Sequence, residues 1–137
     1  MKEIIEKLEK ATGPDRRLDV EIDCAIRFPA LRPARKDDHK EHQRGFPPSE
    51  GDIYVPTGFL MANSYTSSID AALTLVPEDC YADLIERCAE SCFGTPGRFR
   101  AVVNYWGDER YIGDTHDVRD IALCIAALRA RSDGGEG

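Results

Sequence analysis

The strongest strand signal in the chain is the segment RFRAVVNYW at residues 98–106. Its aromatic and β-branched residues are the types enriched in strands, and the pair Gly107-Asp108 after it is typical of a turn. The segment 110–112 then has the composition of a short strand that could pair back. A small antiparallel sheet centred on residues 98–106 is therefore predicted.

Helical spacing of apolar residues on both sides of this sheet predicts four helices, at residues 2–12, 14–27, 67–76 and in the last part of the chain. The last helix is the most regular, with Val118, Ile121 and Ile125 on one face and a flexible tail expected at 132–137. The pattern predicts one α+β domain spanning residues 1–137, in which helices pack in layers on the sheet.

Two segments give weaker signals. Five prolines punctuate residues 28–64, and the charged run 35–44 contains no apolar residue, so no periodic element is expected there. A short edge strand at Asp52–Val55 is the exception, and the rest is predicted to be a functional or a disordered loop. Residues 78–93 have helical spacing at Tyr81, Leu84 and Ile85, while the alternative of a strand requires an alternation that the segment shows poorly.

Composition and charge exclude several function classes. The chain has 137 residues, of which 42% are hydrophobic, and its 18 basic and 25 acidic residues give a net charge of -7. Residues 46–137 carry the excess, with seven bases against fifteen acids. Such a chain is not expected to bind nucleic acid or an anionic membrane directly. Its apolar runs are too short to span a bilayer, and no secretory signal is recognisable, so we expect a cytoplasmic protein with reduced cysteines.

No combination of residues predicts a metal site, a cofactor or an enzyme. His39 and His42 could join Cys88 and Cys92 in a zinc set, but the histidines lie in a charged run and the cysteines at core-like positions. Cys80 is the best-placed nucleophile candidate, yet its acidic neighbours disfavour a reactive thiolate. His116, the remaining base, is expected to be an exposed residue near a helix cap.

Binding is the better-supported class. Arginine and aromatic side chains on a strand can anchor a partner or a nucleotide. The candidate binding residues lie on and just after the predicted central strand: Arg98, Arg100, Tyr105, Trp106, Asp108 and Glu109.

Three segments, 8–19, 65–77 and 122–131, together resemble a group of small uncharacterised phage and prophage proteins similar to the phage ABA-sandwich domain. They cover 35 residues in the family's order. The resemblance implies a layered α+β fold in which a sheet follows the helix that ends at Leu75-Val76-Pro77 and precedes the last helix. It therefore favours a strand over residues 81–92, and it supplies no catalytic residue.

We therefore expect a phage-type accessory protein of the host cytoplasm that binds a host or phage protein through its acidic second half. A basic host protein, including one that normally holds nucleic acid, is the expected partner, and inhibition of a host defence complex is the most specific form of this hypothesis. The alternative is capture of a nucleotide-like ligand through Arg98, Arg100 and nearby aromatic side chains.

Overall fold

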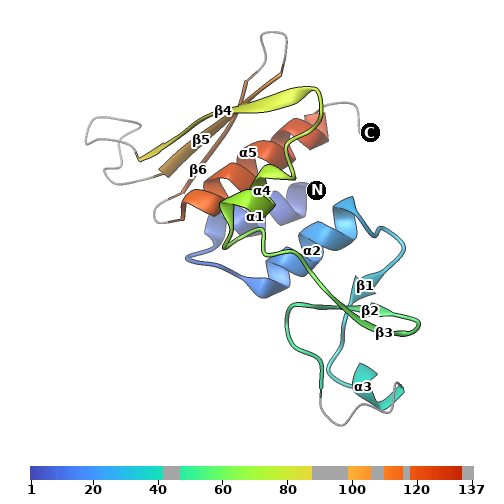
Figure 1. Ribbon diagram of the computed structural model, residues 1–137. Helices are drawn as coiled ribbons and strands as arrows, with labels where there is room; N and C mark the ends of the chain where they lie inside the picture. Colours follow the sequence, from blue (N-terminus) through green and yellow to red (C-terminus); the bar gives the residue numbers. More distant parts are fainter. Residues whose placement is uncertain (42–46, 88–98, 106–109, 116–117, 134–137) are drawn as a thin grey trace. The chain divides into compact units, whose positions relative to one another are not determined.

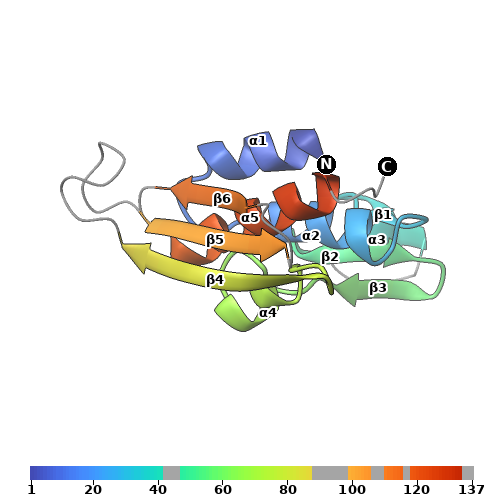
Figure 2. The same cartoon turned by 90° about the horizontal axis from the view of Figure 1, so that it is seen from above.

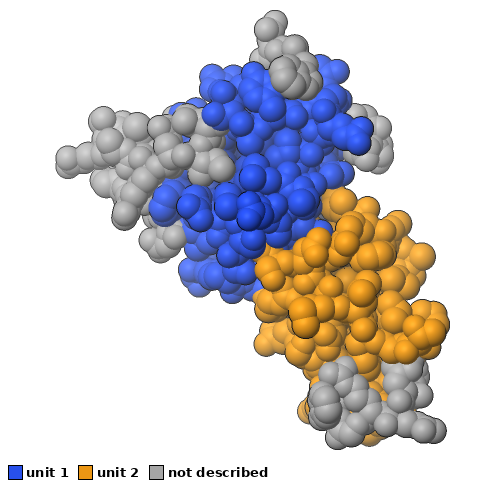
Figure 3. Space-filling view, in the orientation of Figure 1, with its two compact units in different colours: residues 1–15, 65–137 blue, residues 16–64 orange. Residues whose placement is uncertain are grey.

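The structure, a computed structural model, describes residues 1–41, 47–87, 99–105, 110–115 and 118–133 (Figure 1). Helices pack against two three-stranded antiparallel sheets, which confirms the predicted α+β fold. Whereas the sequence predicts one domain, the chain divides into two compact units, coloured separately in Figure 3. Unit 1 comprises residues 1–15 and 65–137, unit 2 comprises residues 16–64, and each is described by itself.

Unit 1 contains the predicted central sheet, in the order β4-β5-β6. Its elements are α1 (Lys2–Lys10), α4 (Ile69–Leu73), β4 (Cys80–Arg87), β5 (Phe99–Tyr105), β6 (Arg110–Thr115) and α5 (Arg119–Asp133). The strand predicted at residues 98–106 is confirmed as β5, and the returning strand predicted at 110–112 is confirmed as the longer β6. The helices predicted at 2–12 and 67–76 are present but shorter, and residues 134–137 of the predicted tail lie outside the described residues.

The helix α5 forms the core of unit 1. It lies between the sheet on one side and α1 and α4 on the other (Figures 1 and 2). Every residue from Ile121 to Leu128 is fully buried, because a helix packed on all sides needs small or apolar side chains around its whole circumference. Gly113 on β6 permits the close approach of the sheet, since a Cβ at this position would lie 2.1 Å from the carbonyl oxygen of Ala122.

The structure decides between the two alternatives for residues 78–93 in favour of a strand at 80–87. The pairing register jumps between Ala82, which lies opposite Val103, and Leu84, which lies opposite Val102. Such a β-bulge interrupts the two-residue alternation of a strand. The helical spacing in the sequence is therefore misleading, and residues 88–93 lie outside the described part of the chain.

Unit 2 contains α2 (Arg16–Ile26), β1 (Arg32–Pro33), α3 (Asp38–Glu41), β2 (Asp52–Val55) and β3 (Gly58–Met61). The prediction of a segment without periodic elements at 28–64 is therefore wrong. The predicted strand at Asp52–Val55 is confirmed, but it is the central strand of the sheet β1-β2-β3 and not an edge. The helix predicted at 14–27 is α2, which packs on this sheet, so it does not belong to the layers of unit 1.

Paired aspartates contribute much of the interior of unit 2, whose apolar core is a small cluster around Val20 and Ile53. The buried carboxylate of Asp23 accepts hydrogen bonds from Nε and Nη2 of Arg27 at 2.7 and 2.8 Å and from a backbone N–H at 2.9 Å. Asp38 accepts two from Arg32 at 3.0 Å each, and these hydrogen bonds lower its pKa. Charge pairs of this kind leave no apolar periodicity in the sequence.

The chain passes from unit 1 to unit 2 after residue 15 and returns after residue 64, and hydrogen bonds within each unit hold the residues on either side of these two positions. In unit 1, the buried hydroxyl Oγ1 of Thr66 accepts from the backbone N–H of Asp15 at 2.8 Å and donates to its carbonyl oxygen at 3.2 Å. In unit 2, the guanidinium of Arg16 donates to the carbonyl oxygen of Ala62 at 2.8 Å and to Oγ of Ser64 at 3.1 Å. The first pair of hydrogen bonds therefore holds together the two chain segments of unit 1, and the second pair holds together the two ends of the single segment that forms unit 2.

Candidate binding pocket

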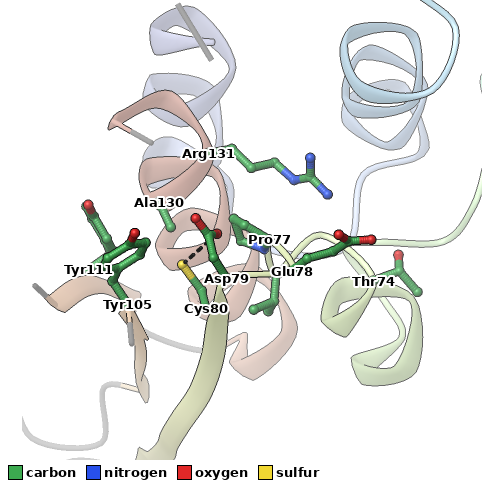
Figure 4. A pocket seen from close by; sticks show the side chains of 10 residues that line it. Thr74, Pro77, Glu78, Asp79, Cys80, Tyr105, Tyr111, Ala130 and Arg131 are labelled. Atoms are coloured by element: carbon green, nitrogen blue, oxygen red, sulfur yellow. Dashed lines mark hydrogen bonds between the residues drawn. The ribbon is translucent and has the colours of Figure 1, made fainter. Parts of the chain in front are cut away.

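A pocket of about 900 Å³ opens in unit 1 at one end of the sheet (Figure 4). Its walls come from the loop after α4, the first residue of β4, the strands β5 and β6, and the last turns of α5. The side chains that give it chemical character are Glu78, Asp79, Cys80, Tyr105, Tyr111 and Arg131. Figure 4 shows the two tyrosines on one side of Cys80 and Glu78 on the other.

Strand pairing brings three of these side chains to one face of the sheet. Cys80 lies directly opposite Tyr105, and Tyr111 lies opposite Val103, two residues before Tyr105 on β5. Directly opposed residues and alternate residues of a strand share a face. Gly113, two residues after Tyr111, contacts α5, so this face is the one that α5 covers. Tyr105, the last residue of β5, is 42% exposed.

The helix α5 supplies the opposite wall and the positive charge of the pocket. Arg131 donates from Nε to the carbonyl oxygen of Leu75 at 2.5 Å, which fixes the guanidinium against the end of α4. It forms no salt bridge with Glu78 or Asp79. Arg131 also lies in the last turn of α5, where a basic side chain complements the helix dipole.

The two carboxylates of the pocket are exposed. Glu78 and Asp79 have no cationic partner within the part of the chain that the structure describes. Asp79 accepts a hydrogen bond from the thiol of Cys80, at 3.7 Å between Sγ and Oδ1. The pocket thus offers two carboxylates, one guanidinium and two phenol rings.

The candidate binding residues from the sequence are not gathered into one site. Tyr105 lines the pocket, whereas Arg100, half-buried and five positions earlier on the same regular strand, lies on the opposite face of the sheet. The strand therefore separates these two side chains. Arg98, Trp106, Asp108 and Glu109 lie outside the described residues.

The described residues give no metal or nucleophilic constellation. No group of three His, Cys, Asp or Glu side chains among them is placed to hold a metal ion. His39 contacts the carbonyl oxygen of Lys36 through Nδ1, at 3.0 Å, while His42, Cys88, Cys92 and His116 lie outside the described ranges. Cys80 begins a strand, so it lacks the helix N-terminus that could activate a thiol.

A second hollow of about 530 Å³ lies between α1 and the end of α5. Glu9 and Arg129 line it and form an ion pair with each other, and Arg129 also donates to the carbonyl oxygen of Ile112. These charged groups are already paired within unit 1. Lys2 and Glu6 also line it, so its described lining carries two charges of each sign and lacks the net negative charge of the pocket beside Glu78 and Asp79.

No helix in the described part of the chain is both long and apolar enough to cross a membrane. Comparison with known proteins found no matching family model, no matching curated protein and no matching solved structure. The resemblance to phage proteins that the three segments suggest therefore stays a prediction.

Proposed function

We propose that this protein is an acidic protein-binding module whose binding surface belongs to unit 1. The observation that carries the proposal is the division of charge between the units. Unit 1 has ten basic and seventeen acidic residues, whereas unit 2 has eight of each, so unit 1 accounts for the whole net charge of -7.

The two units also use their carboxylates differently. In unit 2, Asp19, Asp23 and Asp38 are buried and paired with arginines inside the fold. In unit 1, exposed carboxylates follow one another from α4 into β4: Asp70, Glu78, Asp79 and Asp83. Exposed charges of one sign steer a partner of the opposite sign and set the specificity of its binding.

The partner class follows from this charge. A basic protein surface, including one that normally holds nucleic acid, complements unit 1. A phage-type accessory role, with inhibition of a host defence complex as its most specific form, belongs to the same proposal and rests on the sequence resemblance alone.

The test is a salt-dependent capture experiment with the full chain immobilised and bacterial proteins identified by mass spectrometry. The variant Asp70→Asn with Asp83→Asn removes two exposed charges from unit 1, and Asp37→Asn with Glu50→Gln removes two from unit 2. We expect basic proteins to be retained at low salt and released at high salt, with weaker retention by the unit 1 variant only. Retention that ignores salt, or an equal loss in both variants, would refute the proposal.

A further inference from the structure

The pocket at the end of the sheet has the chemistry of a cation site. The rings of Tyr105 and Tyr111 line it, and the face of an aromatic ring attracts a cation. Glu78 and Asp79 line the same pocket, and each carboxylate can form a charge-assisted hydrogen bond with an ammonium or guanidinium group.

These carboxylates are available for a ligand. Arg131 is the basic residue of the described lining; it forms no salt bridge with either acid, and its Nε donates to the carbonyl oxygen of Leu75. Among the residues that the structure describes, the lining holds two carboxylates and one guanidinium, which sum to a net charge of -1. A ligand with a positive charge therefore gains more here than an anionic one.

The last turn of α5 adds to this preference. Ala130 and Arg131 belong to that turn and line the pocket. The carboxyl end of a helix carries a partial negative charge that favours cations nearby. Rings, carboxylates and helix end thus act in the same direction.

We propose that this pocket binds a lysine or arginine side chain of the basic partner. The inference rests on the proposed function, and it specifies where on unit 1 the partner is anchored. The pocket volume of about 900 Å³ also leaves room for backbone on either side of the bound side chain.

The first test uses a defined probe, the peptide acetyl-Gly-Arg-Gly-amide, titrated into the full chain with ring-labelled tyrosines and followed by NMR. The chain has five tyrosines, so the rings act as internal controls. We expect shifts at Tyr105 and Tyr111 and none at Tyr65, which is buried in the core. The same peptide with citrulline keeps the shape and loses the charge, and we expect it to bind roughly tenfold more weakly. Equal binding of both peptides, or shifts at other rings only, overturns the inference.

The second test compares two variants that each lose two negative charges from unit 1. Glu78→Gln with Asp79→Asn changes the pocket, whereas Asp70→Asn with Asp83→Asn changes exposed acids outside its lining. We expect about a five- to tenfold loss of peptide affinity in the first and less than about a twofold loss in the second. Equal losses contradict a specific pocket.

Failure of this inference is distinguishable from failure of the proposed function. If the peptide does not bind the pocket but basic proteins are still captured in a salt-dependent way, only the anchor site is wrong. If capture also fails, the proposed function is wrong as well. The citrulline comparison uses the wild-type chain, so it stays decisive even if a variant is destabilised.

Discussion

Replacing Gly113 by alanine tests how closely the sheet of unit 1 packs on its central helix. The new Cβ would lie 2.1 Å from the carbonyl oxygen of Ala122, 2.7 Å from the backbone nitrogen of Ala126 and 2.9 Å from Cβ of Ile125. To restore an ordinary contact of about 3.4 Å, the helix backbone must retreat by roughly 1.3 Å, because neither backbone atom can rotate away.

That retreat weakens the whole contact between α5 and the sheet. A radial gap of about 1 Å already costs a quarter to a half of the dispersion attraction between the facing atoms. Overpacking a core costs about 1–3 kcal/mol, and we expect the upper end here because backbone is displaced rather than a side chain.

The assay is urea unfolding combined with hydrogen exchange of the α5 amides, which reports the stability of unit 1 itself. Gly13→Ala is the matched control, since a Cβ at Gly13 meets no atom within 4 Å. It should change the free energy of unfolding by less than about 0.5 kcal/mol. If Gly113→Ala has an equally small effect, the proposed close contact between β6 and α5 does not exist.

Three further predictions concern unit 2. Asp23→Ala removes the partner of Arg27 and of the backbone N–H of Asn63. Hydrogen exchange should show unit 2 destabilised by about 2–3 kcal/mol, whereas no change would exclude a structural role for the pair. The lowered pKa of Asp38 means that its pair with Arg32 stabilises the fold above the ordinary carboxyl pKa of 3.8, and that this contribution is lost as the pH falls through the lowered value. An NMR pH titration should show this loss, and Asp38→Asn should abolish it. Burial, assisted by the charges of Asp23 and Glu21, raises the pKa of Cys24, so iodoacetamide should modify it more slowly at neutral pH than a model thiol, as mass spectrometry can measure.

The parts of the fold with long periodic patterns could be predicted from the sequence. The strand β5 and the helix α5 are examples, because each presents a continuous pattern of apolar or β-branched residues. The strand β4 could not be identified by pattern, since its bulge between Ala82 and Leu84 interrupts the alternation. Unit 2 was missed for another reason: its strands have two to four residues, and arginine–aspartate pairs supplement a small apolar core.

The pocket could not be predicted from the sequence because the residues that line it belong to separate elements. Tyr105 was identified as a candidate from its strand, but its neighbours Tyr111 and Arg131 are placed beside it only by the pairing of β6 and the packing of α5. The same alternation that places Tyr105 in the pocket carries Arg100 to the other face. The sequence of a single strand therefore does not show which side chains from other elements lie beside it.

The hydrogen bonds between Thr66 and Asp15 bring together the two chain segments of unit 1 that flank unit 2 in the sequence. Because Thr66 already ties Asp15 to the start of the second segment of unit 1, a short glycine-serine bridge in place of residues 16–64 has little closure entropy to overcome.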